Sequence, residues 1–202
     1  MNTKKAVFLD RDGTLNVDVG YIRDYGRVRL YPRGIEAVRR INRAGLLALV
    51  ATNQSGIGRG LLTEQDLWTI HAKMSETLAE RKARIDGWYY CPHHEESALD
   101  AFRKNCSCRK PGPGMALQAA RDFGLDLGAS YVIGDKVEDI GFGRAIGATP
   151  VLVLTGFGIR SLETLGARPE GPAFVAPDVL AAVRWILARE KRRRPGPGKT
   201  KA

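Results

Sequence analysis

The sequence predicts an α/β protein in which a parallel sheet is covered by helices on both faces. Short apolar runs alternate with longer segments in which apolar residues recur every three or four positions. Strands that are separated by helices form parallel β-α-β units with right-handed crossovers. Strands that are apolar throughout, such as residues 6–9, indicate a sheet buried on both faces. Because ligands of such folds bind at the carboxyl ends of strands, the residues after each strand are the first candidates for a site.

Each expected element has a local signal. Pro32 and Pro113 lie at the starts of two helices, and Gly45 and Gly124 lie at the ends of the same two. Thr63, three residues before an aspartate, resembles the start of a capping box. The expected strands cover residues 4–10, 46–54, 86–91, 130–135, 149–156 and a short stretch from 174. The expected helices cover residues 30–46, 62–83, 112–124, 136–147 and the rest of 174–190.

The overall composition is that of one globular domain, which we place at residues 1–190. A chain of 202 residues with 44% hydrophobic and 27% charged residues can bury a core without disulfide bonds. Its three cysteines are an odd number, which argues against a disulfide framework. The first apolar run is too short for a signal peptide, and no run approaches the roughly 18 apolar residues of a membrane span. We therefore expect a cytoplasmic protein.

The formal net charge of +10 is concentrated at the carboxyl end. We expect a basic, disordered tail over residues 191–202. Such a tail is able to contact nucleic acid or a membrane surface, but a solvated, frayed end explains it more simply. Its basic residues are Lys191, Arg192, Arg193, Arg194, Lys199 and Lys201.

Two aspartates, Asp10 and Asp12, follow the first expected strand. Gly13 allows the chain to turn sharply, so both carboxylates can face one small volume. Two carboxylates so placed repel each other, which indicates a divalent cation or a division of acid and base roles. An ordinary acidic turn or a calcium loop has the same local pattern.

Three further segments favour a phosphate site over an ordinary turn. Residues 52–56, Thr-Asn-Gln-Ser-Gly, end the second strand with hydroxyl, amide and backbone groups that suit phosphate oxygens. Lys110 precedes a proline-rich turn and a helix, and Asp135 ends another strand. An acid, a hydroxyl, a lysine and a second acid therefore follow one another at the edges of strands and loops.

These four segments resemble the haloacid-dehalogenase-like (HAD-like) superfamily of phosphatases. More narrowly, FLDRDGTLNVDVGYI, TNQSGIGRG, YYCPHH, CRKPGPGM and VIGDKVEDI are similar to the D-glycero-D-manno-heptose 1,7-bisphosphate 7-phosphatases, with the histidinol-phosphate phosphatases as close relatives. The resemblance covers roughly residues 5–155. It implies a Rossmann-like (HAD-like) parallel sheet with no large cap domain and a zinc-bound loop insertion.

The resemblance also implies a mechanism. Asp10 is expected to be the nucleophile that forms an aspartyl phosphate, and Asp12 the general acid and then the general base. The expected magnesium ligands are the Asp10 side chain, the Asp12 backbone carbonyl and Asp135. Thr52 and Lys110 are expected to hold the phosphoryl oxygens, with help from the backbone amide of Asn53.

The same resemblance places further residues at the substrate. Arg109 is the best candidate for a second anionic group, because its guanidinium can bind two oxygens at once. Asp139 is expected either to order Lys136 or the metal site, or to be a solvent-facing acid on its helix. The expected substrate-binding residues, besides those named above, are Asp18, Val19, Gly20, Tyr21, Gln54, Ser55 and Lys136.

All three cysteines fall between residues 91 and 108, in the pattern Cys-x-His-x12-Cys-x-Cys. Cys91, His93, Cys106 and Cys108 offer three sulfurs and one imidazole, which make a closed tetrahedral zinc site. The one-residue gaps are tighter than in common zinc fingers, but the resembled family carries these four ligands. Three unpaired thiols beside a surface histidine, and His94 in place of His93, are the alternatives. A structural zinc would order the loop 92–107 and fix the direction of Lys110.

The predicted function is magnesium-dependent removal of the 7-phosphate of D-glycero-D-manno-heptose 1,7-bisphosphate, in the supply of ADP- or GDP-heptose for lipopolysaccharide core. Histidinol-phosphate phosphatase is the alternative within the class. A nucleic-acid 3′-phosphatase is suggested by the basic tail, but the chain lacks interleaved aromatic and basic residues. A non-catalytic phosphate-binding protein would not need both Asp10 and Asp12. We expect a monomer that acts on a small sugar phosphate, with no membrane or nucleic-acid partner.

Overall fold

A single parallel sheet organises the computed structural model, which describes residues 3–166 and 170–193. Within these ranges the strand order is β3-β2-β1-β4-β5-β6, and every neighbouring pair is parallel. The strands are β1 (Ala6–Leu9), β2 (Leu47–Asn53), β3 (Gly87–Cys91), β4 (Tyr131–Gly134), β5 (Thr149–Val153) and β6 (Phe174–Ala176). The helices are α1 (Pro32–Arg43), α2 (Glu64–Glu80), α3 (Gly114–Phe123), α4 (Val137–Ala145), α5 (Gly158–Leu165) and α6 (Val179–Arg193), with short 3-10 turns η1 (Tyr25–Arg27) and η2 (Asp100–Phe102). The predicted α/β class is confirmed.

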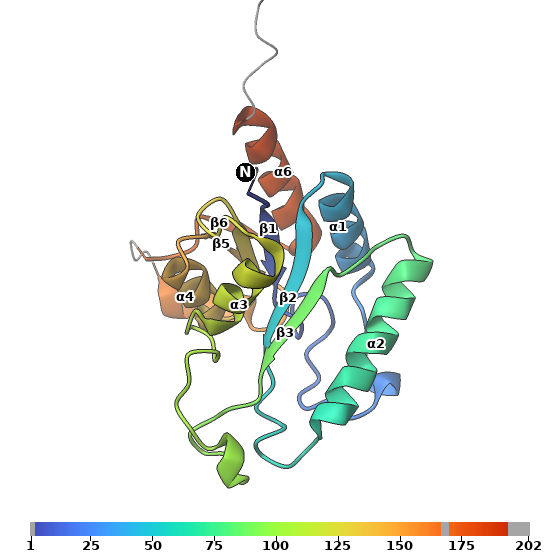
Figure 1. Cartoon of the computed structure of the whole chain (residues 1–202). Coiled ribbons are helices and arrows are strands. Elements are labelled where there is room, and N and C mark those ends of the chain that lie inside the picture. Colours follow the sequence, from blue (N-terminus) through green and yellow to red (C-terminus); the bar gives the residue numbers. More distant parts are fainter. Residues whose placement is uncertain (1–2, 167–169, 194–202) are drawn as a thin grey trace, which may run out of the picture.

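Both faces of the sheet are buried, which explains why the strands are apolar throughout. In β1, Val7 and Leu9 pack into a core with residues of α1 and α6, while Ala6 and Phe8 pack against α3 and α4. Figure 1 shows the sheet between these two groups of helices. Since successive side chains of a strand point to opposite faces, a strand in this position has no polar side.

The expected start and stop signals of the helices operate as predicted. Thr63 accepts a hydrogen bond from the backbone N–H of Asp66, whose carboxylate accepts from the N–H of Thr63. This reciprocal pair is the capping box, and it satisfies two donors at the start of α2. Gly124 ends α3 in the left-handed region at φ 67°, where a residue with a Cβ is disfavoured.

Two features of the carboxyl-terminal part differ from expectation. Helix α5 was not predicted, and helix α6 continues to Arg193, three residues into the segment that was predicted to be a disordered tail. The remaining tail residues, 194–202, lie outside the described residues.

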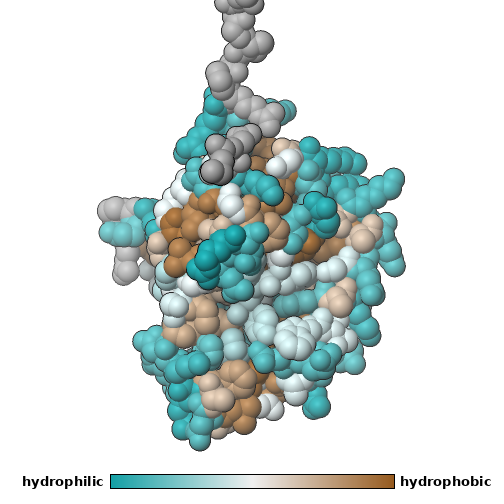
Figure 2. Space-filling view, in the orientation of Figure 1, coloured by the Kyte–Doolittle hydropathy of each residue, from teal (hydrophilic) through white to brown (hydrophobic). Residues whose placement is uncertain are grey.

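The described helices include none with the length and apolar content to cross a membrane. Figure 2 shows a mostly hydrophilic face with hydrophobic residues in separate groups.

The order of the strands decides where a site can form. The chain order reverses between β1 and β4, which lie side by side at the centre of the sheet. Loops that follow neighbouring strands separate at such a point and leave a crevice at the carboxyl edge. This edge is the lower end of the sheet in Figure 1, to which the arrowhead of β3 points. The end of α6 lies at the opposite edge, where Arg193 lines a hollow with Lys4 and Lys5.

Candidate active site

A cavity of about 290 Å³ lies at the carboxyl edge of the sheet. It collects most of the residues that the sequence predicted for catalysis and substrate binding. Val19 is not among its described lining residues, and Glu138 and Phe157, which were not predicted, are. Phe157 comes from the turn before α5, the helix that sequence reasoning missed. The lining residues are Asp10, Asp12, Asp18, Gly20, Tyr21, Thr52, Asn53, Gln54, Ser55, Arg109, Lys110, Lys136, Glu138, Asp139 and Phe157.

Glycine at position 13 brings the ends of β1 and β4 together. Gly13 has φ +89°, and a Cβ built there would lie 2.2 Å from Oδ2 of Asp135. Gly156 also has a positive φ, and its Cβ would meet the same oxygen at 2.2 Å. A side chain at either position would therefore push Asp135 away. Without one, Asp10, Asp135 and Asp139 each offer an oxygen within 4.8 Å of the others.

These carboxylates carry more negative charge than their surroundings compensate. Burial raises the pKa of Asp10 to about 6, although Lys110 acts in the opposite direction. Burial, together with the charges of Asp10 and Asp139, raises the pKa of Asp135 to about 8. Buried carboxylates that destabilise one another in this way fit a hard divalent cation with oxygen ligands, such as Mg²⁺. The donor set of Asp10 and Asp135 therefore fits the predicted metal.

Lys110 is held among acceptors at the bottom of the cavity. Its ammonium group donates to Asp10 Oδ1 at 2.7 Å, to the backbone carbonyl of Ala51 at 2.7 Å and to Asp139 Oδ1 at 2.5 Å. Burial alone would lower the pKa of Lys110, but Asp10 and Asp139 raise it, so the group is a permanent cation. Its donors are directed to the protein, so its effect on a phosphoryl group is that of a fixed charge beside Asp10.

Asp139 is a member of this cluster and not a solvent-facing acid. It is 1% exposed, and its second oxygen accepts a hydrogen bond from the backbone N–H of Lys136 at 2.9 Å. That contact caps the start of α4, so the alternative in which Asp139 faces solvent is wrong. One carboxylate thus ties the Lys110 ammonium to the α4 amino terminus.

Asn53 positions the backbone of Lys110 from the neighbouring strand end. The N–H of Lys110 donates to Asn53 Oδ1 at 3.0 Å, and Asn53 Nδ2 donates to the Lys110 carbonyl at 3.2 Å. The amide side chain therefore pairs with both polar groups of one residue, as a neighbouring strand would. This role of the Asn53 side chain was not predicted, since the sequence assigned only its backbone amide to phosphate binding.

Asp12 is surrounded by hydrogen-bond donors. Burial by itself would raise its pKa, but the Arg11 guanidinium beside it and hydrogen bonds from Asn16 and Gln54 hold that pKa below its usual range. Gln54, which was predicted to bind substrate, donates to Asp12 at 3.0 Å and to Thr52 at 2.8 Å. Sequence reasoning missed Arg11 and Asn16, and the signal available for Arg11 was a cation between two functional acids.

The rim of the cavity carries a second set of charged groups. Lys136 donates to Asp18 at 3.1 Å and lies 5.0 Å from the ring centre of Phe157. Burial would lower the pKa of Lys136, but Asp10, Asp135 and Asp18 raise it. Arg109 donates to the backbone carbonyl of His93 at 3.2 Å. Two cations therefore flank the cavity, one near α4 and one on the cysteine-containing loop.

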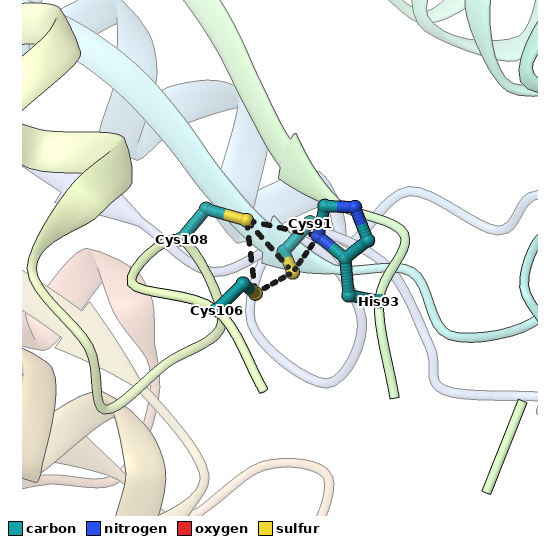
Figure 3. Close-up of side chains that lie close together, drawn as sticks. All are labelled: Cys91, His93, Cys106 and Cys108. Carbon is teal, nitrogen blue, oxygen red and sulfur yellow. Dashed lines mark hydrogen bonds between the residues drawn. The ribbon is translucent and has the colours of Figure 1, made fainter. Parts of the chain in front are cut away.

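The predicted zinc ligands meet at one point beside this cavity (Figure 3). The sulfurs of Cys91, Cys106 and Cys108 lie 3.2 to 3.5 Å apart, and His93 Nδ1 lies 3.2 Å from Cys108. A tetrahedral zinc with Zn–S bonds of about 2.3 Å separates its sulfurs by about 3.8 Å, so a small expansion accommodates the ion. His94 instead accepts a hydrogen bond from the backbone of Glu96, which argues for His93.

Comparison with known proteins gives a consistent family. Residues 107–182 match a family model described as HAD-hydrolase-like. The D-glycero-beta-D-manno-heptose-1,7-bisphosphate 7-phosphatase of Escherichia coli is 45% identical over 152 residues, which cover 75% of this chain and 80% of that protein. The enzyme of the same name from Pasteurella multocida is 45% identical over 155 residues, 76% of this chain and 83% of that one.

Solved structures agree with these sequence matches. The D,D-heptose 1,7-bisphosphate phosphatase of B. bronchiseptica, complexed with magnesium and phosphate, matches with a TM-score of 0.82 and 34% identity over 92% of this chain and 99% of that one. The corresponding phosphatase of Burkholderia thailandensis matches with a TM-score of 0.69 and 35% identity, over 92% and 99% of the two chains. This chain therefore belongs to the HAD-like D-glycero-beta-D-manno-heptose-1,7-bisphosphate 7-phosphatase family.

Proposed function

We propose that this phosphoric monoester hydrolase removes the 7-phosphate of D-glycero-D-manno-heptose 1,7-bisphosphate through an aspartyl phosphate at Asp10. The observation that carries the proposal is the position of Asp10, at the end of β1 in the cavity and 2.7 Å from Lys110. An ionised carboxylate beside a fixed cation can attack an anionic phosphoryl group with less repulsion. The names of the relatives favour the heptose substrate over histidinol phosphate.

The reaction proceeds in two displacements at phosphorus. A carboxylate oxygen of Asp10 forms a bond to phosphorus, and the bond between phosphorus and the sugar oxygen breaks. The departing oxygen takes the proton of Asp12, whose protonation is favoured when a phosphate dianion lies beside it. A water molecule then gives a proton to Asp12 and attacks phosphorus, which regenerates Asp10 and releases inorganic phosphate.

Asp10, Asp135 and the backbone carbonyl of Asp12 would hold magnesium. When bound, Mg²⁺ neutralises the charge that gathers between carboxylates and phosphate. The fit of the two buried carboxylates to a hard cation supports this assignment, and so does the magnesium in the B. bronchiseptica structure. Thr52 and the backbone at Asn53 would bind the phosphoryl oxygens.

The cysteine cluster would hold a structural zinc. Three sulfurs and one imidazole leave no position open for a reacting water. Cys108 lies two residues before Lys110, and Arg109 lies between them. A zinc bound by these ligands would therefore hold the segment that carries Arg109 and Lys110 toward the cavity.

Arg109 and Lys136 would bind the second phosphate of the substrate and so favour a bisphosphate. Both line the cavity, and a guanidinium can bind two phosphate oxygens at once. The product would be a sugar 1-phosphate, which suits a later nucleotidyl transfer. The expected monomeric state and cytoplasmic location stay predictions.

Steady-state rates on heptose 1,7-bisphosphate (both anomers), histidinol phosphate and a 3′-phosphorylated oligonucleotide test the proposal. We expect the heptose bisphosphate to have the highest kcat/KM and Asp10→Asn to abolish turnover. Rapid acid quench of the wild-type enzyme with a ³²P-labelled substrate should trap phosphate on Asp10. Turnover by Asp10→Asn, or a preference for histidinol phosphate, would contradict the corresponding part of the proposal.

A further inference from the structure

Arg11 is a buried cation for which the proposed reaction has no role so far. It stands between the two functional aspartates in the sequence, but its side chain is 1% exposed and is not among the described residues that line the cavity. Burying a guanidinium is costly unless its donors are all paired. The partners of Arg11 therefore indicate what the residue is for.

These partners lie around Asp12. Arg11 Nε is 3.1 Å from both carboxylate oxygens of Asp12, and Nη2 donates to Oδ2 at 2.7 Å. The same Nη2 donates to Gln54 Oε1 at 3.2 Å, while Gln54 Nε2 donates to Asp12 at 3.0 Å. Arg11, Gln54 and Asp12 thus form a closed ring of contacts. Asn16 Nδ2 donates to the other carboxylate oxygen of Asp12, Oδ1, at 2.9 Å.

His71 supports the far side of the guanidinium. Its Nε2 lies 3.5 Å from Arg11 Nη1, and because arginine is a donor, that nitrogen must be an acceptor. Burial and the charge of Arg11 lower the pKa of His71 to about 3, so the ring is neutral and able to accept. The His71 ring stacks on the Trp88 ring, with 4.3 Å between the ring centres. The Ser75 hydroxyl accepts a hydrogen bond from the Trp88 indole N–H and donates one to the His71 carbonyl.

The chain of contacts therefore runs from α2 through Arg11 to the acid-base carboxyl group. We propose that Arg11, backed by His71, is a positioning residue that holds the Asp12 carboxyl group in line with both proton transfers of the reaction. This inference rests on the proposed role of Asp12. A bidentate guanidinium defines the plane of a carboxylate, which a lysine ammonium cannot do.

The inference predicts a dependence on the leaving group. A sugar alkoxide departs poorly without a proton, whereas p-nitrophenolate departs readily without one. A displaced Asp12 should therefore slow formation of the aspartyl phosphate from the sugar phosphate, but not from p-nitrophenyl phosphate. Hydrolysis of the aspartyl phosphate needs Asp12 as a base in both cases, so it should slow for both substrates.

The test compares Arg11→Lys, His71→Leu and His71→Gln with Asp12→Asn, which removes the acid-base group directly. Arg84→Lys, an exposed arginine paired with Asp86, is the matched control. For Arg11→Lys we expect kcat on the heptose bisphosphate to fall by about 10- to 100-fold, within the range of acid-base catalysis, with KM changed less than about twofold. With p-nitrophenyl phosphate, stopped flow should show a burst of p-nitrophenolate at a nearly wild-type rate, followed by slow turnover.

His71 variants keep the test decisive if Arg11→Lys does not fold by circular dichroism. His71→Leu removes the acceptor for Arg11, so we expect a smaller loss of kcat on the heptose bisphosphate and the same preserved burst of p-nitrophenolate. His71→Gln keeps an acceptor, so its kcat on the heptose bisphosphate should be close to that of wild type. Equal losses of the phosphorylation rate on both substrates, or a raised KM with unchanged kcat, would overturn the inference. If Asp12→Asn shows the leaving-group pattern and the Arg11 and His71 variants do not, this inference alone fails. If Asp12→Asn lacks the pattern, the proposed role of Asp12 fails first.

Discussion

The pairing of Asn53 with the backbone of Lys110 leads to a quantitative prediction for Asn53→Ala. The substitution removes two hydrogen bonds, of 3.0 and 3.2 Å, from the backbone of Lys110, which is 4% exposed. Each such bond contributes about 0.5–1.5 kcal/mol, so the free energy of unfolding should fall by about 1–3 kcal/mol. Without these bonds the Lys110 ammonium is free to shift. A shift of a catalytic group by about 1 Å costs on the order of 100-fold in rate, so kcat/KM of Asn53→Ala should fall by about 10- to 100-fold.

The chain supplies a matched control for this prediction. Asn42 makes the same reciprocal pair with the backbone of Arg84, at 3.0 and 2.8 Å, on the exposed surface away from the cavity. Asn42→Ala should lower stability slightly, because water can replace the lost partners, and should leave kcat/KM unchanged. Urea unfolding and steady-state kinetics on both variants separate the two effects. If Asn53→Ala keeps kcat/KM within twofold of wild type, the Asn53 side chain does not position Lys110.

Three further predictions concern the metal sites and stability. Cys108→Ser should lower both the zinc content measured by atomic absorption and the phosphatase rate, and unchanged activity in zinc-free protein would contradict a structural zinc. Removal of divalent cations with EDTA should abolish turnover, and added Mg²⁺ should restore it; full activity in the metal-depleted enzyme would refute a metal at Asp10 and Asp135. Burial would raise the pKa of Glu190, but hydrogen bonds from Lys5 and Tyr131 lower it. A lowered carboxyl pKa stabilises the fold above its unfolded value of about 4.3, and this contribution is lost as the pH falls through the folded pKa. Glu190→Gln should therefore lower the free energy of unfolding, measured with urea, by about 1 kcal/mol at pH 7, and by less at a pH below the folded pKa of Glu190. An equal loss at the two pH values would refute the ionised state of Glu190 as the source of this stability.

Elements with a strong local pattern were predictable, and elements without one were not. The six strands and five of the helices in the described residues carry apolar runs, helical spacing or capping residues. Helix α5 buries Gly158, Ser161 and Leu165, while Ile159 is 62% exposed. Of these buried residues only Leu165 is large and apolar. A helix of eight residues makes little more than two turns, which is too short for a recurring apolar spacing to stand out.

The membership of the site was predictable where chemistry and strand ends coincide. Asp10 and Asp135 are unusual residues to find directly after buried strands, and each lies where the fold class places ligands, whereas Lys110 precedes the proline-rich turn before α3. The residues that support Arg11 and Asp12 have no comparable sequence signal. His71 lies on the buried side of an amphipathic helix, where a histidine is compatible with ordinary core packing, and Asn16 lies in an irregular loop.

By itself, the sequence determined the order of the strands and of all described helices except α5, the acidic groups at the strand ends and the four residues that meet in the cysteine cluster. These depend on spacings within short segments, which local backbone geometry sets. The tertiary structure decided which other side chains meet them. Placing β4 beside β1 brings Asp135 against Gly13, and packing α2 on the sheet brings His71 to Arg11. Contacts between residues so distant in the chain depend on strand order, register and side-chain packing, none of which a local pattern encodes.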